Sequence, residues 1–231
     1  MSETVTLEAS DGHELEAYVA RPGGSAIAGL VVVQEAFGVN RHMRKVTDGY
    51  ANEGFLAIAP ALFDRIERGV ELGYEGADRE KGIALARQTN LDNAVKDVAA
   101  GLEYLRRIVK KCGVIGYCLG GTMAWLAATR LAVDAAVGYY GGNIANFAQE
   151  NPRCPVILHF GSLDKHIPKE AVDKVQAAHP EVEIFWYAAD HGFNCDDRAA
   201  YNPAAAILAR ERSLEFLKKH LAIGKQHPGD G

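Results

Sequence analysis

Hydrophobic and polar positions follow two different patterns along this chain. Around the turn Ser10-Asp-Gly, residues 5–9 and 14–19 alternate between apolar and polar side chains, which predicts an antiparallel hairpin with one solvated face. The later strands are continuous apolar runs, which are typical of parallel strands buried on both faces. The predicted buried strands cover residues 29–34, 55–59, 113–117, 135–140 and 155–160, and a last strand covers 182–187.

Segments with apolar residues at three- and four-residue spacing separate these runs and predict helices. They cover residues 43–53, 91–109, 120–131, 169–178 and 204–221. Strands that alternate with helices indicate an α/β fold with a doubly wound, mostly parallel sheet, which here follows the antiparallel hairpin.

No internal repeat or linker interrupts this alternation. We therefore interpret residues 1–231 as a single α/β domain in which residues 1–3 and 223–231 are frayed. Residues 63–90 are charged, contain several glycines and show no clear periodicity. They are interpreted either as solvated surface or as a loop over the site.

Composition and charge narrow the possible classes of function. Hydrophobic residues make up 48% of the 231 residues, and the net charge of −5 gives no basic surplus for binding a phosphate backbone. Nucleic acid is therefore not an expected partner. The polar, acidic start lacks the features of a secretory signal, and no apolar run approaches the length of a bilayer span. We expect a cytoplasmic protein without a membrane partner.

Cys118 lies between a predicted buried strand and a predicted helix, in the sequence Gly116-Tyr-Cys-Leu-Gly-Gly. A nucleophile elbow needs this order of strand, sharp turn and helix, with small neighbours around a strained backbone. The helix N-terminus, which begins with the Leu119 amide, favours negative charge on the sulfur and on an oxyanion. Taken alone, a tight turn around a buried cysteine is an equally good interpretation. The remaining cysteines show no metal-ligand spacing: Cys112, Cys154 and Cys195.

Two further residues follow separate predicted strands in the order acid, then base, that an α/β-hydrolase requires. Asp164 comes after strand 155–160, and His191 comes after strand 182–187. Histidine suits a general base because its ordinary pKa is near neutrality. Alone, Asp164 is better interpreted as a turn-forming residue, but the combined order favours a triad with Cys118. Asp190 is an alternative partner for His191, although neighbours in an extended loop point in different directions.

These residues together resemble the dienelactone hydrolase (carboxymethylenebutenolidase) family over about residues 4–221. The resemblance implies the α/β-hydrolase fold and hydrolysis of a small ester or lactone by a Cys–His–Asp triad, without a metal or organic cofactor. It also implies a monomer or a weak homo-oligomer. The matching motifs are Gln34-Glu-Ala-Phe-Gly-Val-Asn, Gly116-Tyr-Cys-Leu-Gly-Gly, Gly138-Tyr-Tyr-Gly, Gly161-Ser-Leu-Asp and Asp190-His-Gly-Phe.

The resemblance also implies roles that spacing alone does not reveal. Glu35 matches a glutamate that contacts the resting thiol and rearranges when substrate binds; its alternative interpretation is an ion-paired loop residue. The Ala36 amide would be the second oxyanion donor, beside that of Leu119. Three residues are expected to contact the substrate: Arg79, Phe37 and Tyr140.

One departure from the family pattern bears on the substrate. Family members specialised for dienelactone hold its carboxylate with arginines, and one of these falls where this chain has Cys195, with Arg198 as the nearest substitute. An esterase of the same family that acts on other lactones or simple esters is therefore the closest alternative. A non-catalytic protein that senses thiol chemistry or binds a ligand is the second, although it would need neither the acid nor the base.

Overall fold

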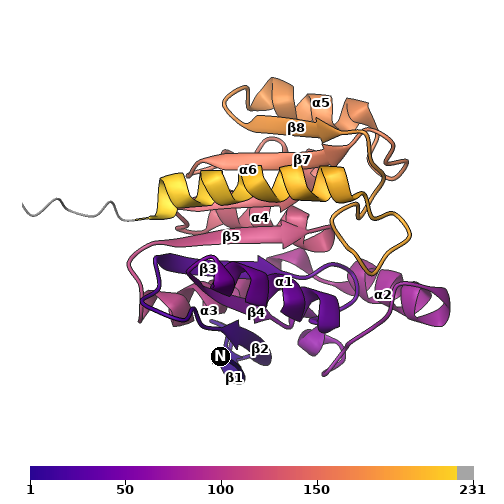
Figure 1. Cartoon of the computed structure of the whole chain (residues 1–231). Coiled ribbons are helices and arrows are strands. Elements are labelled where there is room, and N and C mark those ends of the chain that lie inside the picture. The colour runs from indigo at the N-terminus through magenta and orange to yellow at the C-terminus, as the bar shows by residue number, and fades with distance from the viewer. Residues whose placement is uncertain (223–231) are drawn as a thin grey trace, which may run out of the picture.

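The strands form one mixed sheet in the order β1-β2-β4-β3-β5-β6-β7-β8 in the computed structural model, which describes residues 1–222 (Figure 1). β1 pairs antiparallel with β2, β2 pairs antiparallel with β4, and every later pair is parallel. This confirms the predicted parallel sheet with an N-terminal antiparallel hairpin. The strands are β1 (Ser2–Glu8), β2 (Glu14–Ala20), β3 (Ala28–Val33), β4 (Phe55–Pro60), β5 (Cys112–Tyr117), β6 (Ala135–Tyr139), β7 (Val156–Gly161) and β8 (Glu183–Tyr187).

Burial follows the two hydrophobic patterns of the sequence. Every residue of β3 through β7 is buried, whereas β1 buries only Leu7 and β2 alternates between exposed and buried residues over 14–17. The hairpin also begins earlier than expected, because Ser2 and Glu3 pair with Ala20 and Val19 where a frayed end was predicted. Arg21 donates two hydrogen bonds of 2.8 and 2.9 Å to Glu3 and fixes this end. The expected fraying of 223–231 lies outside the described residues.

The five predicted helices are present, with ends shifted by at most a few residues. In Figure 1, α1 and α6 lie on one side of the sheet, and α3 and α4 lie on the other. Within residues 1–222, no helix combines the length and the apolar character that crossing a membrane requires. These helices are α1 (Arg41–Asn52), α3 (Leu91–Arg106), α4 (Leu119–Arg130), α5 (Lys169–Ala178) and α6 (Pro203–Leu221), beside the 3₁₀ turns η1 (Leu62–Arg65) and η2 (Ile144–Phe147).

A further helix, α2 (Gly76–Gln88), occupies the segment that the sequence left without structure. Only Gly82 and Leu85 of this helix are buried, so the segment has no apolar stripe from which a helix could be predicted. Figure 1 shows α2 beyond the end of the sheet toward which β5 and β7 point. It is therefore the helix, and not a loop, that reaches the carboxyl edge of the sheet, where ligands bind in such folds.

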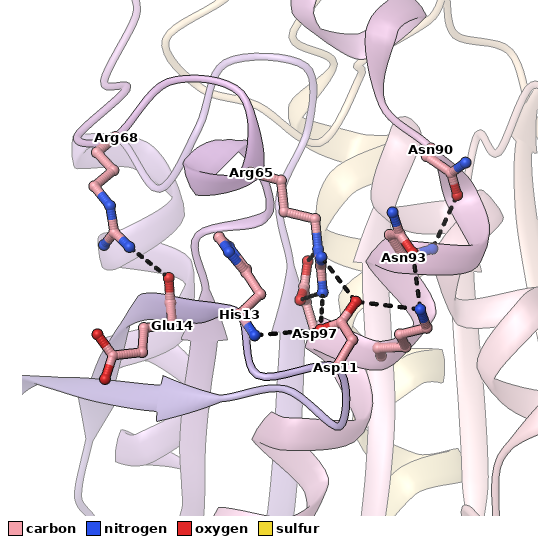
Figure 2. A network of polar contacts seen from close by, with 9 residues as sticks. Asp11, His13, Glu14, Arg65, Arg68, Asn90, Asn93 and Asp97 are labelled. Carbon is pink, nitrogen blue, oxygen red and sulfur yellow. Dashed lines mark hydrogen bonds and ion pairs between the residues drawn. The ribbon is translucent and has the colours of Figure 1, made fainter.

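Arg65 ties the N-terminal hairpin to the rest of the fold. Its guanidinium donates to both carboxylate oxygens of Asp97 on α3, at 2.7 and 2.8 Å, and to Asp11 in the hairpin turn, at 3.0 and 3.1 Å (Figure 2). Asp97 is fully buried, so the guanidinium is the partner that makes its charge tolerable. The hairpin turn, η1 and α3 are thus held by one side chain.

His159 on β7 lies in a buried polar network beneath the edge of the sheet. The Ser213 hydroxyl donates to the Ala209 carbonyl at 2.8 Å, so it accepts from His159 Nε2 at 3.0 Å. The other ring nitrogen, Nδ1, then accepts from the Tyr187 hydroxyl at 2.8 Å. Burial, assisted by nearby Arg212, lowers the pKa of His159 to about 3. The ring is therefore a neutral core group.

This network predicts a specific loss of stability in acid. The unfolded chain takes up a proton on His159 below about pH 6.5 and the folded chain does not, so stability is full above that pH and falls as the pH drops toward about 3. His159→Gln removes this group, and unfolding in urea at pH 7 and pH 5 should show the wild type losing about 2 kcal/mol more than the variant. Equal losses would show that His159 is protonated in the fold.

Candidate active site

Cys118 occupies a strained turn between β5 and α4. Its φ of 55° and ψ of −112° lie in a region that non-glycine residues rarely adopt. Two close backbone approaches enforce the turn: a Cβ atom on Gly116 would lie 1.8 Å from the Gly120 carbonyl oxygen, and one on Gly120 would lie 2.2 Å from the Val33 carbonyl oxygen. The predicted elbow is therefore present, and it presents the Cys118 side chain, partly exposed, at the N-terminus of α4.

Three side chains form a continuous chain of hydrogen bonds at the carboxyl ends of the parallel strands. His191 Nε2 lies 3.3 Å from Cys118 Sγ, and His191 Nδ1 lies 2.7 Å from Asp164 Oδ2. Asp164 Oδ1 accepts from the His166 amide at 2.7 Å, which fixes the carboxylate. Asp190 instead accepts from the His191 backbone amide at 2.7 Å, so Asp164 is the residue that contacts the ring.

The charges of these groups support one another. Burial alone would lower the pKa of His191, but the Cys118 sulfur and the Asp164 carboxylate outweigh it and raise that pKa to about 10. Burial likewise opposes ionisation of Asp164, and the His191 hydrogen bond overcomes it and lowers the pKa of that carboxyl. At neutral pH the imidazole therefore carries a proton and lies between the Cys118 sulfur and the Asp164 carboxylate.

Two backbone amides beside the sulfur have no acceptor. Within residues 1–222, neither the Ala36 amide nor the Leu119 amide donates a hydrogen bond. Both residues line the same cavity as Cys118. Free amides at a helix N-terminus and in a facing turn are the donors that an oxyanion requires.

Glu35 is buried behind the elbow, with an exposed fraction of 1%. Its Oε1 atom accepts from the Tyr140 hydroxyl and from Arg198, each at 3.4 Å. No hydrogen bond within residues 1–222 joins Glu35 to Cys118, so the glutamate faces an arginine rather than the thiol that the resemblance implies. Burial lowers the pKa of Arg198, but the Glu35 charge outweighs it and keeps that pKa raised.

Arg198, the nearest substitute in the sequence for the arginine replaced by Cys195, points toward Glu35. The Arg198 guanidinium packs directly on Gly192, where a Cβ atom would lie 2.2 Å from it. The guanidinium also stacks on the rings of Phe37 and Tyr74, at 5.7 and 5.8 Å. Its positive charge is thus held by aromatic faces and by the Glu35 carboxylate.

A cavity of about 360 Å³ opens onto Cys118 and His191. Its wall is mostly apolar, with Arg87 of α2 as its one cationic side chain within residues 1–222 apart from the histidines. The lining residues are Ala36, Ile83, Ala86, Arg87, Cys118, Leu119, Thr122, Gly142, Asn143, His166, Ile167 and His191.

The three residues expected to contact substrate do not line this cavity. Phe37 and Tyr140 are only 4% and 1% exposed and lie behind Glu35 and His191, while Arg79 is on an exposed part of α2. Arg87, two turns further along the same helix, lines the cavity instead. Nothing in the sequence indicated that Arg87, rather than Arg79, lines the cavity, because α2 itself was not predicted.

The chain was compared with known proteins once this geometry was clear. The sequence pattern of the dienelactone hydrolase family matches residues 15–221. A carboxymethylenebutenolidase from Pseudomonas putida is 32% identical over 227 residues, which cover 94% of this chain and 96% of the relative. The resemblance inferred from the elbow and its neighbours is therefore confirmed.

Solved structures have the same architecture. A candidate dienelactone hydrolase from Klebsiella pneumoniae superposes with a TM-score of 0.81 at 27% identity, over 95% of this chain and 99% of that chain. The Pyrococcus furiosus esterase Pf2001 shares the fold, with a TM-score of 0.71 at 16% identity over 96% of this chain and 93% of that chain. The expected α/β-hydrolase fold is thus confirmed, and the chain belongs to the dienelactone hydrolase family of hydrolases.

Proposed function

We propose that this hydrolase cleaves small carboxylic esters or lactones with Cys118 as nucleophile. The observation that carries the proposal is the chain from Cys118 Sγ through His191 to Asp164, at 3.3 and 2.7 Å, facing two free amides. The mechanism uses the pair as thiolate and imidazolium, with the His191 ring placed between the Cys118 sulfur and the Asp164 carboxylate.

In the first half-reaction, the Cys118 thiolate attacks the ester carbonyl carbon and forms a carbon–sulfur bond. The carbonyl oxygen becomes an oxyanion that accepts hydrogen bonds from the Ala36 and Leu119 amides. Collapse of this intermediate breaks the carbon–oxygen bond, and His191 transfers its Nε2 proton to the leaving oxygen. In a lactone the leaving oxygen stays attached to the acyl chain, so the ring opens without release of a fragment.

In the second half-reaction, neutral His191 removes a proton from water, and the resulting hydroxide attacks the thioester carbon. The carbon–sulfur bond breaks, the carboxylic acid leaves, and the thiolate and imidazolium are restored. Asp164 keeps Nδ1 protonated throughout, so that Nε2 serves first as acid and then as base.

Glu35, Tyr140 and Phe37 serve in this proposal as positioning residues. Glu35 directly precedes Ala36, so the contacts of its carboxylate with Arg198 and Tyr140 fix the turn that presents the Ala36 amide. The rearrangement that the resemblance implies would require Glu35 to leave Arg198 when substrate enters. Phe37 supports the Arg198 guanidinium from one side.

The cavity favours a substrate with an apolar body and one anionic group. Ile83, Leu119 and Ile167 form apolar wall, and Arg87 places a guanidinium at that wall. An anionic lactone of the dienelactone type fits this description, as the relatives named carboxymethylenebutenolidase suggest. A neutral aryl or alkyl ester would use the apolar wall alone.

Removal of the nucleophile should abolish turnover. Cys118→Ala should reduce kcat/KM for cis- and trans-dienelactone and for p-nitrophenyl acetate by at least about 10³-fold, measured at near-neutral pH. Cys154→Ala is the matched control, because Cys154 precedes the N-terminal end of β7, at the edge of the sheet opposite Cys118. Retained turnover in Cys118→Ala would reject the cysteine mechanism, and no activity in the wild type would favour the ligand-binding alternative.

Two arginines on one helix provide a test of substrate charge. Arg87→Gln should raise KM for dienelactone by about tenfold and leave p-nitrophenyl acetate nearly unchanged, because a single charged hydrogen bond contributes about 1.5–3 kcal/mol. Arg79→Gln, on the same helix but not in the lining of the cavity, should affect neither substrate. The reverse result, with Arg79 important and Arg87 not, would restore the role expected from the sequence.

The resting charge state can be measured directly. NMR titration of the His191 ring should give a pKa near 10 in the wild type, so the ring stays protonated through neutral pH and loses its proton only as the pH rises through about 10. In Cys118→Ala the sulfur that raises the pKa of His191 is gone, and the midpoint should fall by at least about one pH unit. Identical titrations in the two proteins would mean that the sulfur is not charged at rest.

A further inference from the structure

A second group of metal-binding side chains lies behind the triad. Glu35 follows β3, His42 is in the first turn of α1, and Cys195 is in the loop between β8 and α6. All three are buried, and one ligand atom from each lies within 4.8 Å of the other two. Atoms at these separations can share one cation if the three side chains move inward.

His42 has the kind of carboxylate partner that metal-binding histidines commonly have. Its Nδ1 atom lies 3.1 Å from the Asp196 carboxylate. A carboxylate at Nδ1 holds the proton on that nitrogen and leaves the lone pair of Nε2 free for a cation. Lys45 also contacts Asp196, so the carboxylate is held from the solvent side.

Glu35 has an oxygen without a partner. Oε1 accepts from Tyr140 and Arg198, whereas Oε2 is buried and receives no hydrogen bond from any residue in 1–222. A buried carboxylate oxygen without a donor is costly. A cation at this position would supply the missing partner and leave the Arg198 contact in place.

The cluster borders an acidic cavity. His42 and Tyr74 line a space of about 630 Å³, which is larger than the cavity at Cys118. Four carboxylates also line it against one guanidinium, Arg41, which pairs with Asp197 at 3.0 Å. The negative surplus raises the local concentration of cations at the entrance. The four are Glu71, Glu75, Asp78 and Asp197.

We propose that Glu35 Oε2, His42 Nε2 and Cys195 Sγ bind one thiophilic divalent cation of the Zn²⁺ type. A carboxylate oxygen, an imidazole nitrogen and a thiolate form a donor set suited to zinc, and water from the acidic cavity completes four ligands. Binding forms the sulfur–metal bond as the Cys195 thiol proton leaves to solvent. The site is distinct from the Cys118 triad and does not depend on the proposed hydrolysis.

The test uses the full chain with Cys118→Ala, which removes the other cysteine–histidine pair able to hold zinc. Calorimetry should show one equivalent of Zn²⁺ bound, and Co²⁺ should give a thiolate-to-metal absorption band in the near ultraviolet. Adding Cys195→Ala or His42→Gln should remove the band and weaken Zn²⁺ binding at least about tenfold, and Asp196→Asn should weaken it less. Adding Cys154→Ala should change neither measurement.

X-ray absorption spectroscopy at the zinc edge identifies the metal ligands in Cys118→Ala itself. This measurement does not depend on whether the further variants fold. It should find one sulfur at about 2.3 Å beside nitrogen and oxygen at about 2.0–2.2 Å. No binding, binding without a sulfur neighbour, or a cobalt band that survives Cys195→Ala in a folded protein would each overturn the proposal.

Discussion

The whole site depends on backbone contact between β3, β5 and the start of α4. With no side chains at 116 and 120, the elbow packs directly on the Gly120 and Val33 carbonyls, and the Gly120 amide donates to the Gln34 carbonyl at 3.0 Å. These contacts accompany the strained backbone of Cys118, whose φ is 55°. They also bring the turn after β3 against the helix N-terminus. Nucleophile, oxyanion amides and Glu35 are therefore placed by a single packing constraint.

Two largely buried histidines near this elbow differ in charge. Beneath the sheet edge, His159 is kept neutral by burial and hydrogen bonds to hydroxyls. At the edge, His191 is kept charged by sulfur and carboxylate although it is also largely buried. Two histidines a few residues from the ends of neighbouring strands thus hold opposite charge states, because the partners of His191 outweigh the effect of burial and those of His159 do not.

Much of this arrangement was predictable from sequence because it follows from local patterns. Continuous apolar runs located the parallel strands, and the order of Cys118, Asp164 and His191 placed one group at each of three strand ends. The helix α2 was missed because it buries almost nothing, and Arg87 was missed with it. Arg79 was chosen from the resemblance alone, which carries residue types but not the direction of a side chain on an unpredicted helix.

The cluster of Glu35, His42 and Cys195 was beyond prediction for another reason. Metal sites are found in sequences by short spacings, and these residues come from three separate segments. The sequence around Cys195 does not indicate which residues lie next to it in the fold. The same is true of Arg198, whose position beside Glu35 follows from how the loop after β8 folds over Gly192.

That crossing at Gly192 makes one loop position part of the support of the site. A residue with a side chain there would have to displace the Arg198 guanidinium and adopt a φ of 79°, although position 192 does not line the cavity at Cys118. The loop after β8 is therefore linked, through Arg198 and Glu35, to the turn that carries the Ala36 amide on the far side of the nucleophile.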